Sequence, residues 1–202
     1  SAPDHAIFVS PRQSRLVVTL HNYYLDAAYA RMSSLHQRIH YRTDLRLFTR
    51  LAFKRAHAIT AVSEFVAKLA QNDLGIDRDI QVIPNGIDVD AFRPQVEAHP
   101  GFRVLFCGNF VRRKGAHLLP SIAAGLAPGS EIWIASGLRD DTIVEVLPDN
   151  CKMIGKVAHA DMPALYSQVD ALLMPTLREG FGLAVAEAMA CGLPVVGSRN
   201  SA

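Results

Sequence analysis

Two glutamates near the end of the chain flank a Gly-Phe-Gly sequence. Seven residues separate Glu179 from Glu187, and a helical pattern begins near Phe181. Gly180 and Gly182 let the backbone approach a ligand closely, and the free N–H groups at the start of a helix favour a phosphate. Carboxylates repel phosphate, but they accept hydrogen bonds from vicinal hydroxyl groups. The stretch therefore indicates a site for a ligand that carries both phosphate and sugar hydroxyls.

The same pattern also has a purely structural interpretation. Glycine-rich turns between a strand and a helix are common in α/β proteins. A glutamate near the first turn of a helix often only compensates the helix dipole. The spacing by itself leaves both interpretations open.

Short apolar strands alternate with helical segments around this stretch. The expected strands are residues 15–20, 58–62, 80–83, 103–107, 131–135, 153–157, 171–174 and 193–197. The expected helices are residues 26–56, 63–75, 115–125, 141–146, 162–168 and 181–192. This alternation predicts an α/β fold with parallel sheets that are covered on both faces. Ligands of such sheets bind at the carboxyl ends of the strands, where the loop after residue 174 lies.

The chain loses its periodicity between residues 88 and 101, where Pro94 and Pro100 occur. Prolines in a segment without helical or strand pattern are typical of a linker. We therefore expect a first α/β domain over residues 1–92, a linker over 93–101 and a second domain over 102–202.

The composition is that of an ordinary globular protein. A net charge of +2 over 202 residues gives no reason to expect nucleic-acid binding. No apolar run is long enough to span a membrane, and the first residues do not resemble a signal peptide. Three scattered cysteines, Cys107, Cys151 and Cys191, indicate reduced thiols in the cytoplasm rather than disulfides or a zinc site.

A basic stripe is expected on the long first helix. It consists of Arg38, Arg42, Arg46, Arg50 and Lys54. Spacing of four residues places such side chains on one face of a helix. The stripe could hold the protein on the anionic inner face of a membrane, near a lipid-linked acceptor, or it could simply be a solvated helix face.

Several segments, in order along the chain, resemble retaining glycosyltransferases of the GT-B fold, family 4 type. The main one is EGFGLAVAEAMACGLPVV, with two glutamates seven residues apart, a helix of small residues and a Gly-x-Pro-Val sequence. The others are VVTLHN, ITAVSEF, VIPNGIDVDAFRP, LFCGNFVRRKGAHLL and GKVAHADMPALYSQVDALLMPTLREGFG. The resemblance covers about residues 16–202. It implies two Rossmann-like domains that face a cleft, with the chain incomplete at both ends.

The resemblance also implies roles for the residues of the opening stretch. Glu187 would bind the ribose hydroxyls of a nucleotide sugar, and Glu179 would bind hydroxyls of the donor sugar. Gly180 belongs to the same donor-binding loop. The backbone amides of Phe181, Gly182 and Leu183 would hold the sugar and the diphosphate.

Residues elsewhere in the chain complete the implied site. Lys114 would neutralise the departing diphosphate, and the backbone near Val157 would meet the nucleobase. His21, in the acceptor-side domain, would lie near the transferred sugar. The family usually has an arginine where this chain has Asn109, so Arg113 or its neighbour Arg112 is expected to supply the missing charge unless both are merely solvated.

The implied reaction moves a sugar from a GDP- or UDP-linked donor to a hydroxyl acceptor, in the synthesis of a cell-surface glycan or polysaccharide. No Asp-x-Asp sequence directly follows an expected strand, so no metal cofactor is expected. Lipid-linked glycan, polysaccharide and small metabolite all stay open as acceptor. The alternatives are a GT-B-like epimerase or phosphorylase, and a nucleotide-sugar-binding module or inactive partner subunit without turnover.

Overall fold

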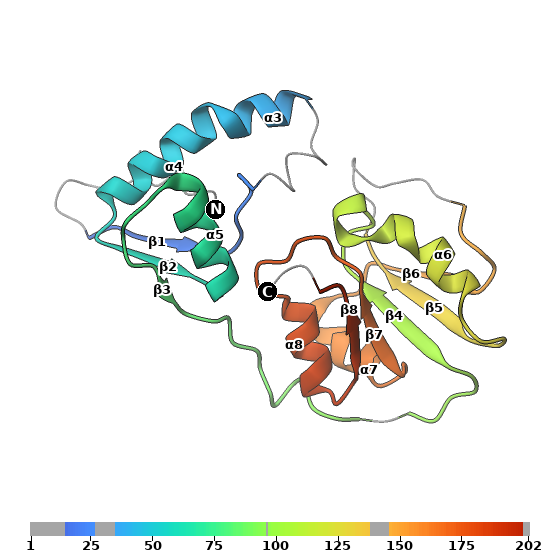
Figure 1. Ribbon diagram of the computed structural model, residues 1–202. Helices are drawn as coiled ribbons and strands as arrows, with labels where there is room; N and C mark the ends of the chain where they lie inside the picture. The colour runs from blue at the N-terminus through green and yellow to red at the C-terminus, as the bar shows by residue number, and fades with distance from the viewer. Residues whose placement is uncertain (1–14, 27–34, 96, 138–145, 200–202) are drawn as a thin grey trace. The chain divides into compact units, whose positions relative to one another are not determined.

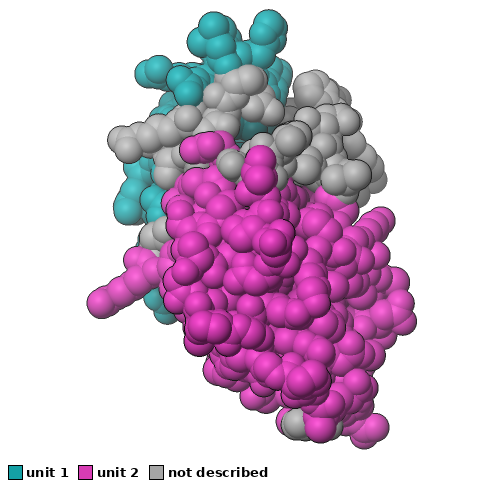
Figure 2. Space-filling view, turned by 90° about the vertical axis from the view of Figure 1, so that its right-hand side faces the viewer, with its two compact units in different colours: residues 1–85, 178–181, 201–202 teal, residues 86–177, 182–200 magenta. Residues whose placement is uncertain are grey.

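The computed structural model of the chain describes residues 15–26, 35–95, 97–137 and 146–199. The chain forms two compact units, which Figure 2 colours separately. Among the described residues, the first unit contains those up to Asn85 together with Arg178–Phe181, and the second contains Gly86–Leu177 and residues 182–199. Four residues late in the sequence therefore belong to the first unit.

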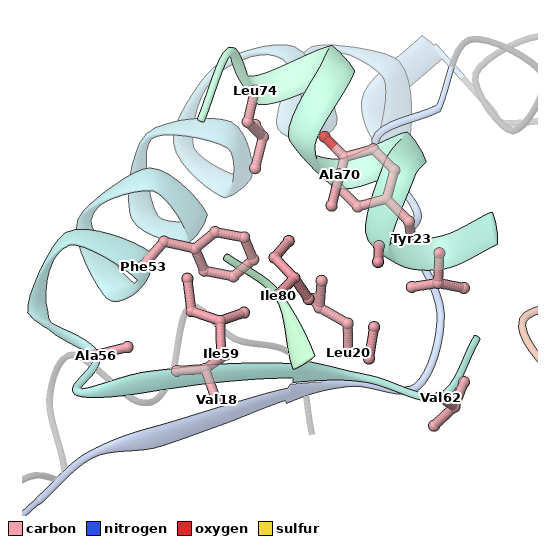
Figure 3. Close-up of a cluster of buried hydrophobic side chains, with 13 residues drawn as sticks. Val18, Leu20, Tyr23, Phe53, Ala56, Ile59, Val62, Ala70, Leu74 and Ile80 are labelled. Atoms are coloured by element: carbon pink, nitrogen blue, oxygen red, sulfur yellow. The ribbon is translucent and has the colours of Figure 1, made fainter. Parts of the chain in front are cut away.

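The first unit is a parallel sheet covered by helices (Figure 1). Its strands are β1 (Val17–Leu20), β2 (Ala58–Ala61) and β3 (Gln81–Val82), and they pair in parallel in the order β1-β2-β3. Its helices are α3 (Leu35–Arg42), α4 (Asp44–Arg55) and α5 (Glu64–Leu74). Apolar side chains of α4 and α5, such as Phe53 and Leu74, pack against Leu20 and Ile59 of the sheet (Figure 3).

The ends of α5 follow the expected chemistry. The Ser63 hydroxyl accepts a hydrogen bond from the Val66 N–H (3.3 Å), as an N-cap residue does. Gly75 ends the helix in the left-handed conformation, with φ of 61°. The helix with its two caps therefore spans the range 63–75 that the sequence pattern predicts.

The single long helix expected over residues 26–56 is interrupted at Thr43, and residues 27–34 lie outside the described residues. The Thr43 hydroxyl lies within hydrogen-bond distance of two acceptors, the Ile39 carbonyl (2.8 Å) and Asp44 Oδ1 (2.9 Å), and donates its single proton between them. Threonine side chains that bond back to the preceding turn bend helices. The apolar periodicity continues across this bend, which is why the sequence pattern shows one helix.

The second unit is a parallel sheet with helices on both faces. Its strands are β4 (Arg103–Cys107), β5 (Glu131–Ala135), β6 (Cys151–Gly155), β7 (Ala171–Met174) and β8 (Val195–Gly197). They pair in parallel in the order β6-β5-β4-β7-β8. The helices are α6 (Leu119–Ala124), α7 (Met162–Tyr166) and α8 (Leu183–Ala190).

Alternate residues of the second sheet enter two separate cores. Leu105 and Leu172 point to the face where α7 and α8 contribute Tyr166 and Ala188. The opposite face carries Val104, Phe106, Ile132, Ile134 and Leu173, which pack against Leu119 and Ala123 of α6. Side chains on both faces of this sheet are therefore buried, which explains why its strands are nearly continuous apolar runs, as predicted.

Some elements of the second unit differ from the expected ones. The segment expected as one helix over residues 115–125 begins with two 3-10 turns, Arg112–Lys114 and Ala116–Leu118, before α6. Strand β6 begins two residues earlier than expected. Most of the expected helix over residues 141–146 lies outside the described residues.

The boundary between the units lies after Asn85, whereas the sequence pattern places the end of the first domain at residue 92. Phe92 is the reason for the difference, because its buried side chain belongs to the same core as Leu105 and Tyr166. Along the described ranges, no helix is both long enough and apolar enough to span a membrane.

Candidate functional site

Helix α8 follows the loop that leaves β7 and begins at Leu183, two residues later than expected. Gly182 precedes it in the left-handed conformation, with φ of 84°. The helix ends at Ala190, where Gly192, with φ of 79°, turns the chain toward β8. The second turn of α8 carries Glu187.

Glu187 is a buried carboxylate, with 7% of its surface exposed. Its Oε1 lies 3.1 Å from Nε2 of His159, and its Oε2 lies 3.2 Å from the hydroxyl of Tyr166. A buried charge is stable only when it is paired or hydrogen-bonded. Both oxygens of Glu187 meet this requirement within the second unit.

A pocket of ≈ 400 Å³ opens at the carboxyl ends of β4 and β5. Its lining consists of Cys107, Gly108, Asn109, Ala135, Ser136, Gly137, Lys156, Val157 and Met162. Two predicted donor-binding residues, Asn109 and Val157, are thus in one pocket. Lys156 places a cation at its wall, which suits an anionic ligand.

Cys107 connects this pocket with Glu187. Burial, and after it the negative charge of Glu187, raise the pKa of the Cys107 thiol to about 11, while the positive charge of Lys114 opposes the increase. The thiol therefore is neutral at physiological pH. Cys107 also packs against the core that contains Ala188, the neighbour of Glu187 on α8, so Glu187 lies near the carboxyl end of β4.

Lys114 lies in a turn that the surrounding backbone holds tightly. A side chain at Gly108 would meet the Lys114 methylenes at 3.9 Å. The next residue, Gly115, has φ of 80°, and a side chain there would collide with the Pro175 carbonyl. The Arg113 carbonyl accepts a hydrogen bond from the Leu177 N–H (3.0 Å). The turn and the loop after β7 therefore hold each other in place.

Residues 178–181 are packed within the first unit. Arg178 Nε donates to Asp26 Oδ2 (2.7 Å), and its guanidinium lies 5.4 Å from the ring centroid of Phe65. The Ser63 hydroxyl donates to the Gly180 carbonyl (2.6 Å), and Phe181 packs against the apolar core. This segment also contains Glu179, which is half-buried.

His21 follows β1 and is exposed. Its carbonyl lies against Gly180, where a side chain would collide with it. The first unit thus brings together His21, Glu179, Gly180 and Phe181. The second unit contains Asn109, Arg113, Lys114, Val157, Gly182, Leu183 and Glu187.

Sequence reasoning missed four residues near the site: Cys107, Lys156, His159 and Tyr166. His159 lies in a 3-10 turn, His159–Asp161, and Tyr166 is the last residue of α7. Apolar periodicity explains Tyr166 as a core residue, and no spacing relates either residue to Glu187. One signal for Tyr166 was available: a tyrosine at a core position needs a hydrogen-bond partner for its hydroxyl.

Metal binding was not expected for the site. In the part of the chain that the structure describes, no three His, Cys, Asp or Glu side chains gather closely enough to hold a metal ion. The expectation itself stays a prediction.

Comparisons with known proteins identify relatives for both halves of the chain. The family profile described as Glycosyl transferases group 1 matches residues 101–202, and the one described as Glycosyltransferase Family 4 matches residues 3–91. D-inositol 3-phosphate glycosyltransferase of Pseudarthrobacter chlorophenolicus is 29% identical over 71% of this chain and 40% of its own length. The lipopolysaccharide core biosynthesis mannosyltransferase LpsB of Rhizobium meliloti is 29% identical over 77% of this chain and 52% of its own length.

Solved structures with the same fold agree with these matches. Sucrose-phosphate synthase from Thermosynechococcus elongatus has a TM-score of 0.74 at 21% identity, over 92% of this chain and 50% of that one. HepE of Anabaena, solved with UDP-glucose, has a TM-score of 0.74 at 23% identity, over 94% and 54%. The chain thus spans about half the length of the proteins that it matches. The chain has the GT-B fold and belongs to the family of glycosyl transferases group 1.

Proposed function

We propose that the protein transfers a sugar from a nucleoside diphosphate donor to a hydroxyl acceptor, with retention of anomeric configuration. One observation carries the proposal: the buried carboxylate of Glu187 lies beside the carboxyl end of β4, next to a pocket that contains a lysine. A carboxylate accepts hydrogen bonds from ribose hydroxyls, and a cationic pocket suits a diphosphate. Membership of a glycosyltransferase family supports this assignment.

The cations act as the donor bond breaks. Negative charge then grows on the diphosphate, and preorganised positive groups near it stabilise the transition state. Lys114 is the residue that we assign to this task. Lys156, which lines the same pocket as Asn109, is the residue that we assign to compensate for the arginine that is usual at position 109.

The remaining steps use the substrates themselves. The acceptor hydroxyl attacks the face from which the diphosphate leaves, and a phosphate oxygen takes the acceptor proton. We therefore assign no protein nucleophile and no metal. Glu179 would bind hydroxyls of the donor sugar, and His21 would act near the transferred sugar. The backbone amides of Phe181, Gly182 and Leu183 would hold the donor.

The nucleoside diphosphate that we propose for the donor is GDP or UDP. A GDP-mannose-dependent mannosyltransferase of Corynebacterium glutamicum is 26% identical over 70% of this chain and 44% of its own length, and HepE was solved with UDP-glucose. The acceptor that we propose is a hydroxyl of a growing glycan, in the cytoplasm.

Calorimetric titration of the full-length gene product with GDP and UDP tests the proposal. We expect one nucleotide to bind, and Glu187→Gln to weaken its binding about tenfold or more, because hydrogen bonds to a charged group are strong. Glu131→Gln is the matched control. Glu131 of β5 is also a carboxylate with two side-chain partners, Lys152 of β6 and Trp133 of β5, but it has no assigned role in binding. Absence of binding to both nucleotides would refute the proposal.

A turnover assay separates the alternatives. A glycosyltransferase releases the nucleoside diphosphate from a labelled nucleotide sugar and moves the label to an acceptor. An epimerase changes the sugar while it stays on the nucleotide. A binding module, the second candidate because of Asn109, binds the nucleotide sugar and changes nothing.

We also propose that the first unit contacts an anionic membrane through α3 and α4. The structure corrects the predicted stripe, since Arg46 pairs with Asp73 (3.1 Å) and Arg50 donates to the Leu74 carbonyl (3.1 Å). The exposed side of these helices instead carries apolar residues at 35, 39, 47 and 51, alongside the exposed Arg38, Arg42 and Lys54. Exposed apolar residues beside basic ones are typical of helices that lie in the membrane interface.

Sedimentation with lipid vesicles tests this contact. We expect binding to vesicles with anionic lipid, none to neutral vesicles, and loss of binding in high salt. Ile39→Glu should abolish it, while Val89→Glu should not, because Val89 is at least as exposed as Ile39 but belongs to the second unit. Equal effects of both substitutions would rule out a specific role for α3 and α4.

A further inference from the structure

The two oxygens of the Glu187 carboxylate are each held by a different side chain of the second unit. The Tyr166 hydroxyl lies 3.2 Å from Oε2, and His159 Nε2 lies 3.1 Å from Oε1. A carboxylate only accepts hydrogen bonds, so both partners must donate. The orientation of the carboxylate is thus fixed through both of its oxygens.

Tyr166 is suited to this contact because its hydroxyl keeps its proton. The ring is 1% exposed, and burial, followed by nearby negative charge, raises the pKa of the phenol far above its usual range. The hydroxyl also lies 3.3 Å from the Ala184 carbonyl. With one proton and two acceptors, the charged Glu187 forms the stronger bond.

His159 contacts Glu187 from the turn that precedes α7. Its side chain is 75% exposed, yet its ring is placed by contact with Phe92, with the two ring centroids 5.3 Å apart. Phe92 is buried and also contacts Tyr166, at 6.2 Å. One phenylalanine therefore supports both residues that hold Glu187.

We propose that Tyr166 and His159 are positioning residues, which turn the Glu187 carboxylate so that it receives the two vicinal hydroxyls of a ribose. The terminal torsion of a glutamate is broad, so an unsupported carboxylate would sample many orientations. A carboxylate has about four lone-pair sites, and two hydrogen bonds to the protein leave about one site on each oxygen. The inference rests on the proposed function, since it assumes that Glu187 binds the ribose.

A structural role alone makes a different prediction. If the Tyr166 hydroxyl only satisfied a buried charge, its removal would affect every ligand of the pocket equally. If it orients Glu187, its removal affects only ligands with a 2′,3′-diol. A nucleoside diphosphate and its 2′,3′-dideoxy counterpart differ in this group and therefore separate the two roles.

The test is calorimetric titration of the full-length gene product with UDP and GDP, and with the 2′,3′-dideoxy form of whichever binds. We expect Tyr166→Phe, which removes a single oxygen, to weaken binding of the diol nucleotide about tenfold and to leave binding of the dideoxy nucleotide within about twofold. Tyr23→Phe is the matched control, because the Tyr23 hydroxyl also binds a carboxylate, Asp73 (2.5 Å), in the first unit. It should change neither affinity.

His159→Ala gives a second variant with little risk to folding, since the side chain is exposed. It should show the same selective loss. In a Glu187→Gln background, Tyr166→Phe should have no further effect, because a residue that acts through Glu187 cannot act without it.

The outcomes distinguish this inference from the proposed function. If the unaltered protein prefers the diol nucleotide and Tyr166→Phe reduces both affinities equally, or neither, the positioning role is refuted and the proposed function stands. If the unaltered protein binds no nucleotide, or shows no preference for the diol, the assignment of Glu187 fails and this inference fails with it.

Discussion

Glu187 combines burial with a negative charge, and its neighbours respond to that charge. Cys107, the last residue of β4, has its pKa raised to about 11 by burial and by Glu187, while Lys114 acts in the opposite direction. The thiol is thus an internal reporter of the charges at the candidate site. Cys151 serves for comparison, because burial alone raises the pKa of its thiol.

The first prediction uses this thiol. Alkylation requires the thiolate, so at pH 8 Cys107 should react with iodoacetamide about 100-fold more slowly than a thiol of pKa 9.0, before any steric effect. Its rate should rise with pH until about pH 11. Glu187→Gln removes a negative charge, so it should lower the pKa and accelerate the reaction.

Peptide mass spectrometry after timed labelling measures each cysteine separately. Lys114→Met should slow the labelling of Cys107, since loss of a positive charge raises the pKa of the thiol further. Cys151 is the internal control and should respond to neither substitution. An unchanged Cys107 rate in Glu187→Gln would contradict the placement of Glu187 beside β4.

Residue types at the site were only partly predictable. The spacing of Glu179 and Glu187 stands out in the sequence because both lie near glycines that suit a ligand. His159 does not stand out, because a histidine in a short turn looks like any solvated loop residue. Its contact with Glu187 arises from how the turn before α7 lies beside α8, which no local pattern contains.

At the scale of elements, strands were easier to predict than the turns between them. β2, β4, β5 and β7 are buried apolar runs, and the sequence pattern shows them within one residue of their observed bounds. The turn at 112–118 was expected to be partly helical, but two 3-10 turns form there. Their geometry depends on Pro175 and Leu177 of a distant loop, so it is a tertiary property.

The second prediction concerns this turn. Gly115 combines a φ of 80° with a backbone carbonyl, that of Pro175, where a side chain would lie. Gly115→Ala should therefore lower the free energy of unfolding by about 3 kcal/mol, from left-handed strain and overpacking together. Chemical denaturation followed by the fluorescence of Trp133, the single tryptophan of these 202 residues, measures this value in the second unit.

Gly129→Ala provides the matched control in the same unit. Gly129 has φ of 83°, but a side chain there would meet nothing within 4 Å. It should lower the free energy of unfolding by only about 1 kcal/mol. Equal losses for both variants would show that the contact with Pro175 has no energetic weight.

At the scale of the whole molecule, each unit has a core of its own. Units with separate cores can unfold separately. The expectation of two domains came from the loss of periodicity and the prolines between residues 88 and 101. The membership of residues 178–181 in the first unit was not, because Gly180 meets Ser63 across 117 positions of sequence.

The third prediction links the units to the proposed ligand. Nucleotide at 100 times its Kd should stabilise the unit that binds it by about 2.7 kcal/mol. Hydrogen exchange should therefore show slower exchange for amides of β4, β5 and β7, and unchanged exchange for β1 and β2. Glu187→Gln should show no such protection at the same concentration, and an equal increase in both units would show that they unfold as one.

The packing of residues 178–181 has a consequence for anyone who recombines related enzymes. A chimera joined near residue 86 would take Arg178 and Gly180 from one parent, and Asp26, Phe65 and Ser63 from the other. A crossover at this position would thus divide an ion pair, a cation–π contact and a hydrogen bond between residues of two different parents. Recombinants should retain their fold more often when these five positions are inherited together than when only the visible domain boundary is respected.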